Sequence, residues 1–316
     1  MKSKIIVIFL ICILSVQQHC FSEAKKFLVF GGKTGWIGQK ITKYLTEQDH
    51  LVFTAESRME NRNDVDQEIQ RIAPDYIINC AGVTGTPNVD WCEDNKLQTI
   101  RTNIIGTLNL VDLAALHQIH ITNFSTGCIF EYDEKHPMGS GVGFKEEDEP
   151  NFDGSFYSKT KGLLEKLLSY YPNLLNLRLR MPISADLHHK NFITKISRYQ
   201  KVINIPNSMT ILDDLLPIAI DMTLKNVKGV YNFVNTETLS HNEILDLYKY
   251  YIDPSFTYQN FTVEEQDKIL KARRSNNELN TEKLQQLYPN LPSAKDSLHK
   301  VFQKMKNDLD KKQQTK

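Results

Sequence analysis

The 316-residue sequence has no excess of charge, few cysteines and no long low-complexity tract. Lys and Arg number 38, and so do Asp and Glu, which excludes a protein that coats nucleic acid through surplus positive charge. Five scattered cysteines without a Cys-x-x-Cys pair exclude a disulfide scaffold and supply no zinc motif. A hydrophobic share of 41% is too high for a disordered chain and too low for a polytopic membrane protein. We therefore expect a globular protein that uses neither nucleic acid nor metal.

The first 22 residues differ from the rest of the chain. Lys2 and Lys4 precede the apolar run Ile5–Val16, which is too short to span a bilayer comfortably, and small residues follow around Ser22. This pattern predicts a signal peptide over residues 1–22, with an uncleaved signal anchor as the alternative. The leader indicates the secretory pathway and the lumen of the endoplasmic reticulum.

Beyond the leader, short apolar runs alternate with stretches of helical periodicity. Strands are expected at 27–30, 51–53, 76–78, 119–124, 174–179 and 230–234, and helices at 36–45, 102–117 and 157–170. Such alternation is typical of a parallel sheet with helices on both faces. We predict an α/β fold: a Rossmann-type doubly wound parallel sheet with a smaller C-terminal substrate-binding lobe. The expected divisions are a dinucleotide-binding domain over 25–181, a mixed lobe over 182–304 that partly returns to the sheet, and a fraying polar tail over 305–316.

A glycine loop separates the first predicted strand from the first helix. Gly32, Gly35 and Gly38 let the backbone turn tightly and approach a pyrophosphate. The phosphate charge would meet the dipole of the helix that begins near Trp36. Because the loop directly follows an apolar strand, its position favours dinucleotide binding over a purely structural turn. Trp36 and Ile37 belong to the same predicted site.

The residues after the second strand indicate whether the cofactor ribose carries a 2′-phosphate or a free 2′-hydroxyl. Ser57 and Arg58 suit a 2′-phosphate, whereas Glu56 suits a free 2′-hydroxyl. Arg58 favours NADPH as the cofactor, with NADH as the alternative.

Tyr157 and Lys161 are four residues apart in a predicted helix and therefore share one face. A cation this near favours a phenolate, so we expect the pKa of Tyr157 to fall toward the working pH, where it can trade a proton with a carbonyl oxygen. The pair alone is more typical of an exposed helix face. Together with the glycine loop and with Thr126 after the fourth strand, it indicates carbonyl reduction.

These motifs, in this order, resemble the extended short-chain dehydrogenase/reductase family. They are the glycines of 32–38, Asn79–Gly82, Ser125-Thr126 and Tyr157 with Lys161. Longer blocks at 82–92, 126–132, 154–161 and 191–199 resemble, more specifically, the bifunctional UDP-4-keto-6-deoxyglucose 3,5-epimerase/4-reductases, over about residues 26–301.

This resemblance implies conversion of UDP-4-keto-6-deoxy-D-glucose to UDP-L-rhamnose by 3,5-epimerisation followed by NADPH-dependent reduction of the 4-ketone. A 4,6-dehydratase is then the upstream pathway partner, and a homodimer is left open. The relatives act in the cytoplasm, which is the alternative to the compartment indicated by the leader. The competing functions are a plain nucleotide-diphospho-4-keto-rhamnose reductase and a non-catalytic NADP-binding regulatory subunit.

The resemblance also implies a division of labour among five residues. Thr126, Tyr157 and Lys161 serve reduction, whereas Cys128 and Lys195 serve epimerisation. If the fourth strand continues past Thr126, Cys128 points to the same face, because strand side chains alternate. The alternatives are a small buried hydrophobe for Cys128 and a solvated helix position for Lys195.

Further ligand contacts follow from the resemblance. Cofactor contacts are expected at Asp64, Val65, Asn79, Ala81 and Gly82, and substrate contacts at Asn88, Arg180, Asn191, Asn204 and Arg273. Arg273 is expected to bind the substrate phosphate, which a bidentate guanidinium suits, although Arg274 replaces the Pro of the related segment. His188-His189 is interpreted as loop, because no carboxylate or third His is suitably spaced.

Two glycosylation sequons are relevant to whether the protein enters the secretory pathway. Asn123-Phe-Ser125 directly precedes Thr126, and Asn260-Phe-Thr262 lies in the second lobe. A glycan on Asn123 is hard to reconcile with a strand in the core.

Overall fold

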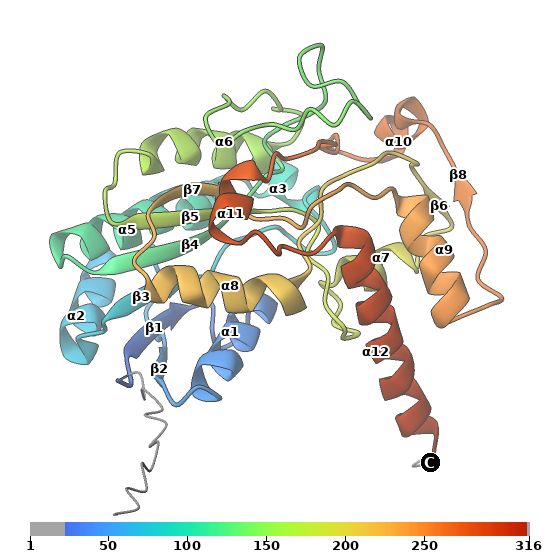
Figure 1. Cartoon of the computed structure of the whole chain (residues 1–316). Coiled ribbons are helices and arrows are strands. Elements are labelled where there is room, and N and C mark those ends of the chain that lie inside the picture. The colour runs from blue at the N-terminus through green and yellow to red at the C-terminus, as the bar shows by residue number, and fades with distance from the viewer. Residues whose placement is uncertain (1–22, 315–316) are drawn as a thin grey trace, which may run out of the picture.

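A six-stranded parallel sheet in the order β2-β1-β3-β4-β5-β7 forms the centre of the molecule (Figure 1). The computed structural model describes residues 23–314, so the predicted leader over 1–22 lies outside the described residues. The strands are β1 (Lys26–Phe30), β2 (Leu51–Thr54), β3 (Tyr76–Asn79), β4 (His120–Thr126), β5 (Leu174–Leu179) and β7 (Gly229–Asn232). All six expected strands are confirmed, with ends shifted by at most two residues.

Helices cover both faces of this sheet. They are α1 (Trp36–Thr46), α2 (Arg62–Ile72), α3 (Trp91–Asp94), α4 (Lys96–Ile100), the π-helix η1 (Arg101–Gly106), α5 (Thr107–Leu116), α6 (Phe156–Leu168) and α8 (Leu212–Leu224). Phe27 and Val29 of β1 pack in one hydrophobic cluster with residues of α1 and α8, and Leu28 and Phe30 pack in another with residues of α2 and α5. Strands buried on both faces have near-continuous apolar sequences, which explains the runs seen in the sequence. The predicted doubly wound fold is confirmed.

The strand order reverses between β1 and β3, because β2 lies on one side of β1 and the later strands lie on the other. Open parallel sheets bind ligands at the carboxyl ends of the strands beside such a switch point. The glycine loop follows β1, and the segment Asn79–Gly82 includes the end of β3. The topology therefore brings both predicted cofactor segments to one crevice.

Most of the other elements form a smaller lobe at one end of the sheet (Figure 1). Its elements are α7 (Phe192–Ile196), β6 (Lys201–Val202), α9 (His241–Tyr251), β8 (Gln259–Asn260), α10 (Val263–Ile269) and α12 (Ala294–Gln314). Helix α11 (Glu282–Leu287) instead packs against β7, with Leu284 in the cluster that contains α1 and α8. Helices α7, α9 and α12 share a hydrophobic cluster separate from the two on the faces of the sheet. Between parts of this lobe the chain returns to the sheet as α8 and β7.

Helix α12 continues to Gln314, so the described part of the predicted polar tail is helical. Leu298, Val301, Phe302 and Met305 follow the spacing of one helix face, and all four are buried in the cluster shared with α9. This apolar stripe anchors the helix, and the charged residues beyond it extend the same helix.

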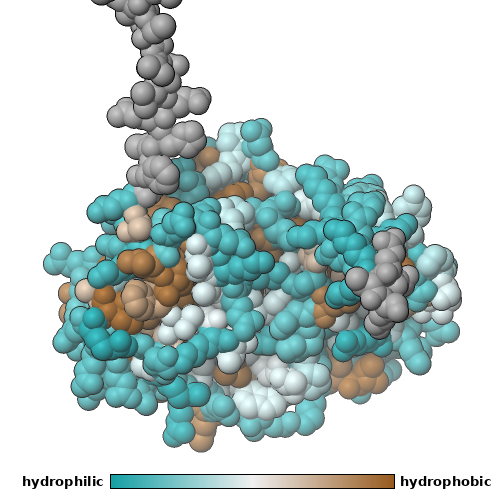
Figure 2. Space-filling model, turned by 90° about the horizontal axis from the view of Figure 1, so that it is seen from below, coloured by the Kyte–Doolittle hydropathy of each residue, from teal (hydrophilic) through white to brown (hydrophobic). Residues whose placement is uncertain are grey.

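Seen from below the view of Figure 1, the surface is mostly hydrophilic, with one larger group of hydrophobic side chains and several smaller ones (Figure 2). Large exposed hydrophobic side chains on the edge strand β2 are Leu51 and Phe53. Within residues 23–314, no helix has the length and apolar character needed to cross a membrane.

Candidate active site

The glycine loop closes on itself between β1 and α1. The N–H of Gly35 donates to the carbonyl oxygen of Gly31 at 2.9 Å. A Cβ atom on Gly35 or Gly38 would lie 2.6 or 2.3 Å from that oxygen, so the turn excludes any side chain there. A Cβ on Gly32 would lie 2.7 Å from the Thr54 side chain of β2. This tight turn leads into the amino end of α1, the arrangement that suits a dinucleotide pyrophosphate.

A segment of the second lobe covers the first turn of α1. Trp36 stacks on His188 with ring centroids 5.4 Å apart and planes at 3°, and its Nε1 donates to Oδ2 of Asp186 at 3.0 Å. Nζ of Lys40 lies 2.6 Å from the same carboxylate oxygen. The predicted cofactor residue Trp36 is thereby buried, and it joins the two parts of the molecule beside the glycine loop.

Asn191 holds this covering segment in place. Its Nδ2 donates to the carbonyl oxygens of Ser184 and Asp186, both at 2.6 Å, and its Oδ1 accepts from the N–H of Ile193 at 3.2 Å. Asn191 is fully buried. In this structure the predicted substrate contact therefore shapes the loop and caps α7.

The turn after β2 is organised by a carboxylate that the sequence analysis did not identify. Glu68 of α2 accepts the N–H of Glu56 at 2.9 Å and both the N–H and the hydroxyl of Ser57, at 3.0 and 2.6 Å. Arg58 is exposed, and Lys33 of the glycine loop forms an ion pair with Glu56. Two cations thus flank the turn predicted to bind the cofactor ribose.

The predicted cofactor contacts Asp64 and Val65 lie in different environments. Asp64 is exposed in the first turn of α2 and accepts from Nδ2 of Asn61 at 3.2 Å. Val65 is fully buried in the hydrophobic cluster with α5, so its side chain contributes to packing. Ile37 is partly buried against the other cluster.

Three buried asparagines form a row across β3, β4 and β5, paired in register. Nδ2 of Asn79 donates to Oδ1 of Asn123 at 2.9 Å, and Nδ2 of Asn123 donates to Oδ1 of Asn176 at 2.7 Å. Oδ1 of Asn79 also accepts the N–H of Ala81 at 3.0 Å. This asparagine row fixes the loop after β3 and encloses the amide of the first sequon.

The row continues to Glu165 of α6. Glu165 accepts hydrogen bonds from Asn176 at 2.9 Å, from Ser125 at 2.5 Å and from Nε of Arg178 at 3.0 Å. The Glu165–Arg178 pair is almost completely buried. Glu165 also lies one helical turn beyond Lys161, a spacing that could have identified it from the sequence.

Lys161 is buried beside the loop that follows β3. Burial lowers its pKa to about 8, against the opposing charge of Glu165. Its Nζ lies 4.0 Å from the position that a Cβ on Gly82 would occupy. Lys161 therefore lies beside Gly82, one of the predicted cofactor contacts.

Thr126, Cys128 and Tyr157 meet at the carboxyl end of β4. The strand ends at Thr126, so the condition for side-chain alternation past this residue is not met. The chain turns at Gly127 instead, and the N–H of Cys128 donates to Oγ1 of Thr126 at 3.0 Å. Tyr157 forms a hydrogen bond with Thr126. The turn thus brings the thiol to the two hydroxyls by a route that strand periodicity does not describe.

Burial raises the pKa of Tyr157, the electrostatic influence of Cys128 raises it further, and the hydrogen bond with Thr126 lowers it. The expectation that Lys161 brings this pKa down is therefore wrong in this structure, because burial dominates. A phenol that keeps its proton can donate it to an oxygen that gains negative charge.

Lys195 lies half-buried on α7. Burial, and secondly the charge of Lys190, lower the pKa of Lys195. In the described part of the chain, no hydrogen bond joins Lys195 to Cys128. The structure therefore brings four of the five predicted catalytic residues to the sheet edge and leaves Lys195 in the neighbouring lobe.

Arg180 lies directly behind Cys128 and is 1% exposed. Its Nη1 donates to Sγ of Cys128 at 3.2 Å and to Oγ of Ser275 at 2.9 Å. Its Nη2 donates to the carbonyl oxygen of Ser275 at 3.1 Å and to Oδ1 of Asn207. Arg180 was predicted to contact substrate, but its guanidinium is enclosed by protein groups.

The other predicted substrate contacts lie in loops. Arg273 is 52% exposed, with Nη2 2.9 Å from the carboxylate of Glu131 and Nε 3.6 Å from that of Asp267. Asn88 accepts the N–H of Asp90 at 2.9 Å, and Asn204 is exposed after β6. Arg273 is thus accessible to a phosphate. The substitution at Arg274 is accommodated by a hydrogen bond of its Nη1 with Asp90 at 2.8 Å.

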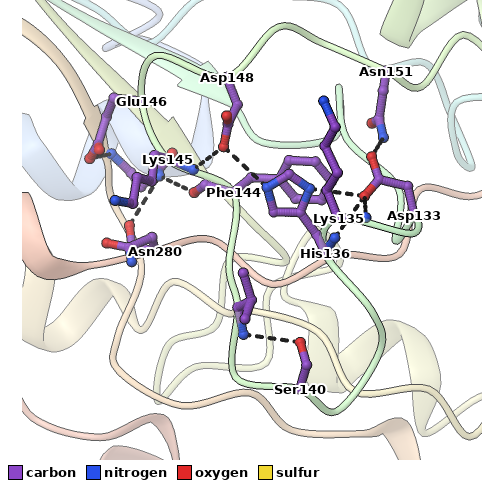
Figure 3. A network of polar contacts seen from close by, with 12 residues as sticks. Asp133, Lys135, His136, Ser140, Phe144, Lys145, Glu146, Asp148, Asn151 and Asn280 are labelled. Carbon is purple, nitrogen blue, oxygen red and sulfur yellow. Dashed lines mark hydrogen bonds and ion pairs between the residues drawn. The ribbon is translucent and has the colours of Figure 1, made fainter.

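The long loop between β4 and α6 is held by a polar network (Figure 3). The ring of His136 stacks on Phe144 with centroids 3.8 Å apart, and its Nδ1 lies 2.9 Å from Oδ1 of Asp133. Its Nε2 lies 3.4 Å from Oδ2 of Asp148, and Asn151 donates to Asp133 at 2.9 Å. The network therefore stabilises the chain that leads from Cys128 to Tyr157.

No group of three or more metal-binding side chains occurs among residues 23–314.

The geometry of the glycine loop and the sheet edge agrees with a family model that matches residues 28–203. The chain belongs to the NAD dependent epimerase/dehydratase family. Among solved structures of this fold, the UDP-rhamnose synthase of Acanthamoeba polyphaga mimivirus is 42% identical, with a TM-score of 0.85, over 89% of this chain and 100% of that one. The dTDP-4-dehydrorhamnose reductase of Bacillus anthracis, solved with NADP, has a TM-score of 0.75 at 19% identity over 89% and 98% of the two chains, a likeness of fold alone.

Two Arabidopsis thaliana proteins are more similar in sequence. A trifunctional UDP-glucose 4,6-dehydratase/UDP-4-keto-6-deoxy-D-glucose 3,5-epimerase/UDP-4-keto-L-rhamnose-reductase is 56% identical over 87% of this chain. A bifunctional dTDP-4-dehydrorhamnose 3,5-epimerase/dTDP-4-dehydrorhamnose reductase is 55% identical over 89% of this chain and 94% of its own length. This chain spans only 41% of the trifunctional relative.

Proposed function

We propose that this protein converts UDP-4-keto-6-deoxy-D-glucose to UDP-L-rhamnose by 3,5-epimerisation followed by NADPH-dependent reduction of the 4-ketone. The observation that carries the proposal is the grouping of Thr126, Cys128 and Tyr157 at the end of β4. A plain reductase needs the two hydroxyl donors but has no use for the thiol beside them. Both Arabidopsis relatives are named as combined epimerases and reductases, which supports the same combination here.

The residues around the switch point fit a dinucleotide. The glycine loop presents backbone where side chains would collide, and Lys161 reaches the loop at Gly82. Lys33 and Arg58 flank the turn after β2, which supports NADPH over NADH. NADPH, when bound, supplies the hydride that adds to C4. Tyr157 and Thr126 would donate hydrogen bonds to the 4-oxygen as it gains negative charge, and Tyr157 would deliver its proton.

Epimerisation uses the same ketone, because a 4-carbonyl acidifies the protons on C3 and C5. The hydroxyls of Thr126 and Tyr157 would hold the enolate oxygen, while Cys128 and Lys195 would remove a proton from one face of the sugar and return one to the other. Burial lowers the pKa of Lys195, which makes its ammonium a better proton donor. The lobe that carries Lys195 would approach Cys128 across the bound sugar.

Exchange of substrate protons tests the epimerase step apart from reduction. The purified protein is incubated with the 4-keto-6-deoxy sugar nucleotide in deuterated water without NADPH, and we expect deuterium at C3 and C5. Cys128→Ala should abolish this exchange and still reduce a substrate that is already epimerised. The control Cys92→Ala should keep both the exchange and the reduction. Absence of exchange by the unchanged protein would leave only a reductase.

The pathway partner and the oligomer are further parts of the proposal. A 4,6-dehydratase would supply the keto sugar; the trifunctional relative carries that activity in its name.

A homodimer is supported by Leu163, Leu167 and Tyr170, three large hydrophobic side chains exposed on and after α6. Leu167→Glu should lower the sedimentation mass to that of a monomer if this face pairs, and an unchanged mass would exclude it.

We propose entry into the secretory pathway, with the cytoplasm as the alternative. Its support is the sequence pattern of residues 1–22. Cell fractionation together with mass spectrometry of the mature N-terminus tests it: an N-terminus at Glu23 is expected, and a cytosolic chain that begins at Met1 would contradict it.

A further inference from the structure

Arg180 is a buried cation that forms no ion pair with a carboxylate in the described residues. It is the largest of the fully buried side chains, at 1% exposure. Arg178, two residues earlier on β5, is also buried but has Glu165 as its counterion. Burying a guanidinium without a compensating negative charge is costly, so the surroundings of Arg180 need an explanation.

All but one of the acceptors around the Arg180 guanidinium are groups that cannot ionise. Ser275 supplies its hydroxyl and its carbonyl oxygen, and Asn207 supplies its amide oxygen. The remaining acceptor is Sγ of Cys128, 3.2 Å from Nη1. Of these groups, only the thiol can become an anion by losing a proton.

Two other titratable side chains sense the charge of Arg180, and both are neutral near pH 7. Burial, and secondly Arg180, lower the pKa of His241 to about 4. Burial also raises the pKa of Tyr132, with Glu278 adding to the rise and Arg180 opposing it. Glu278 acts on Tyr132 but forms no ion pair with Arg180 within residues 23–314. Neither ring therefore supplies the missing negative charge.

We propose that Arg180 is a positioning residue for epimerisation, which holds Cys128 as a thiolate through a charge-assisted hydrogen bond to its sulfur. This rests on the proposed role of Cys128 in the epimerase step. Such bonds are shorter and roughly twice as strong as neutral ones. Because Ser275 and Asn207 fix the guanidinium from its other sides, the sulfur is also held in one direction, next to Thr126.

The proton balance of the step follows from this pairing. The thiolate takes a proton from C3 or C5: the C–H bond breaks, an S–H bond forms, and the electron pair moves to the 4-oxygen, which Thr126 and Tyr157 hold. The ammonium of Lys195 delivers a proton to the opposite face of the same carbon. Proton loss from the thiol to water, and proton gain by the amine, restore the starting forms.

The pH dependence of thiol alkylation tests the pairing without any substrate. Cys128 is half-buried, and peptide mass spectrometry distinguishes it from Cys80 and Cys92 after reaction with iodoacetamide. Arg180→Met should move the alkylation profile of Cys128 upward by about one pH unit or more and slow its reaction at pH 7 about tenfold. Arg180→Lys, which keeps the charge, should fall between the two. Lys271→Ala, which removes an exposed cation paired with Asp94, should keep the original profile.

A second readout connects the pairing to catalysis. Arg180→Met should lose about tenfold or more of deuterium exchange at C3 and C5, while its reduction of an already epimerised substrate stays within about twofold. An unchanged alkylation profile in Arg180→Met overturns the proposal, as does a shifted profile with unchanged exchange. If the unchanged protein catalyses no exchange, the proposed epimerase function fails, whereas the alkylation profile still decides the Arg180–Cys128 pairing.

Discussion

Asn123 donates its side-chain amide to Oδ1 of Asn176 at 2.7 Å, from β4 to the neighbouring strand β5. The same side chain accepts from Asn79 at 2.9 Å and is 1% exposed. Both hydrogen-bonding ends of the amide are thus used within the sheet. Asn123, which the sequence motif predicts as a glycan acceptor, is therefore part of the asparagine row that fixes the loop after β3.

We expect the folded protein to carry no glycan on Asn123. A sugar attached there before folding would separate β4 from β5, so glycosylated chains should appear only in the aggregated fraction. Asn260, exposed on β8, is the internal comparison, because a glycan there meets solvent. Glycopeptide mass spectrometry of soluble protein from a secreting host checks this, and a glycan on Asn123 of active enzyme would contradict the fold of β4.

Replacing Glu165 by Gln should lower the free energy of unfolding by about 3–5 kcal/mol, because Arg178 then stays buried without its counterion. Urea denaturation measures this. The control is Glu149→Gln, which removes an exposed pair with Lys166 and should cost no more than about 1 kcal/mol. Equal costs for the two variants would show that the buried pair contributes no more than a surface one.

Lys161→Met should stabilise the protein near pH 7 while removing reduction. Burial lowers the folded pKa of Lys161 to about 8 from an ordinary 10.5, so between these values the unfolded chain binds more protons and stability rises with pH. Below pH 8 the buried ammonium lowers the free energy of unfolding by on the order of 3 kcal/mol. The variant has no ammonium at this position and avoids this loss. Unfolding of both proteins at pH 7 and pH 10 should show a difference that shrinks as the pH rises. A constant difference would mean that Lys161 is not desolvated.

Arg273→Ala should raise the KM for the sugar nucleotide about tenfold or more and leave kcat within a few-fold, because a charged hydrogen bond to phosphate contributes about 1.5–3 kcal/mol. Lys271→Ala is the control, since Lys271 is an exposed cation two residues away that pairs with Asp94. Steady-state kinetics with saturating NADPH give both constants. If both variants show the same KM, Arg273 makes no phosphate contact.

The sequence by itself determined the sheet, the glycine loop and the order of the motifs. Apolar runs ending at turn residues mark strands buried on both faces, and Gly35 and Gly38 mark a turn with no room for a side chain. The spacing of Tyr157 and Lys161 likewise placed both on α6. Each of these features depends on neighbours within a few residues, which periodicity and local sterics describe directly.

Only the tertiary structure decided what surrounds the thiol. Cys128 meets Thr126 through a turn at Gly127, and Arg180 is enclosed by Ser275, which lies 95 residues further along the chain. Asn191, predicted to contact substrate, is instead buried, because the segment it holds packs on α1. Burial also reversed the expected pKa change of Tyr157. Burial and long-range contacts depend on how distant segments pack, and no local pattern in the sequence records that packing.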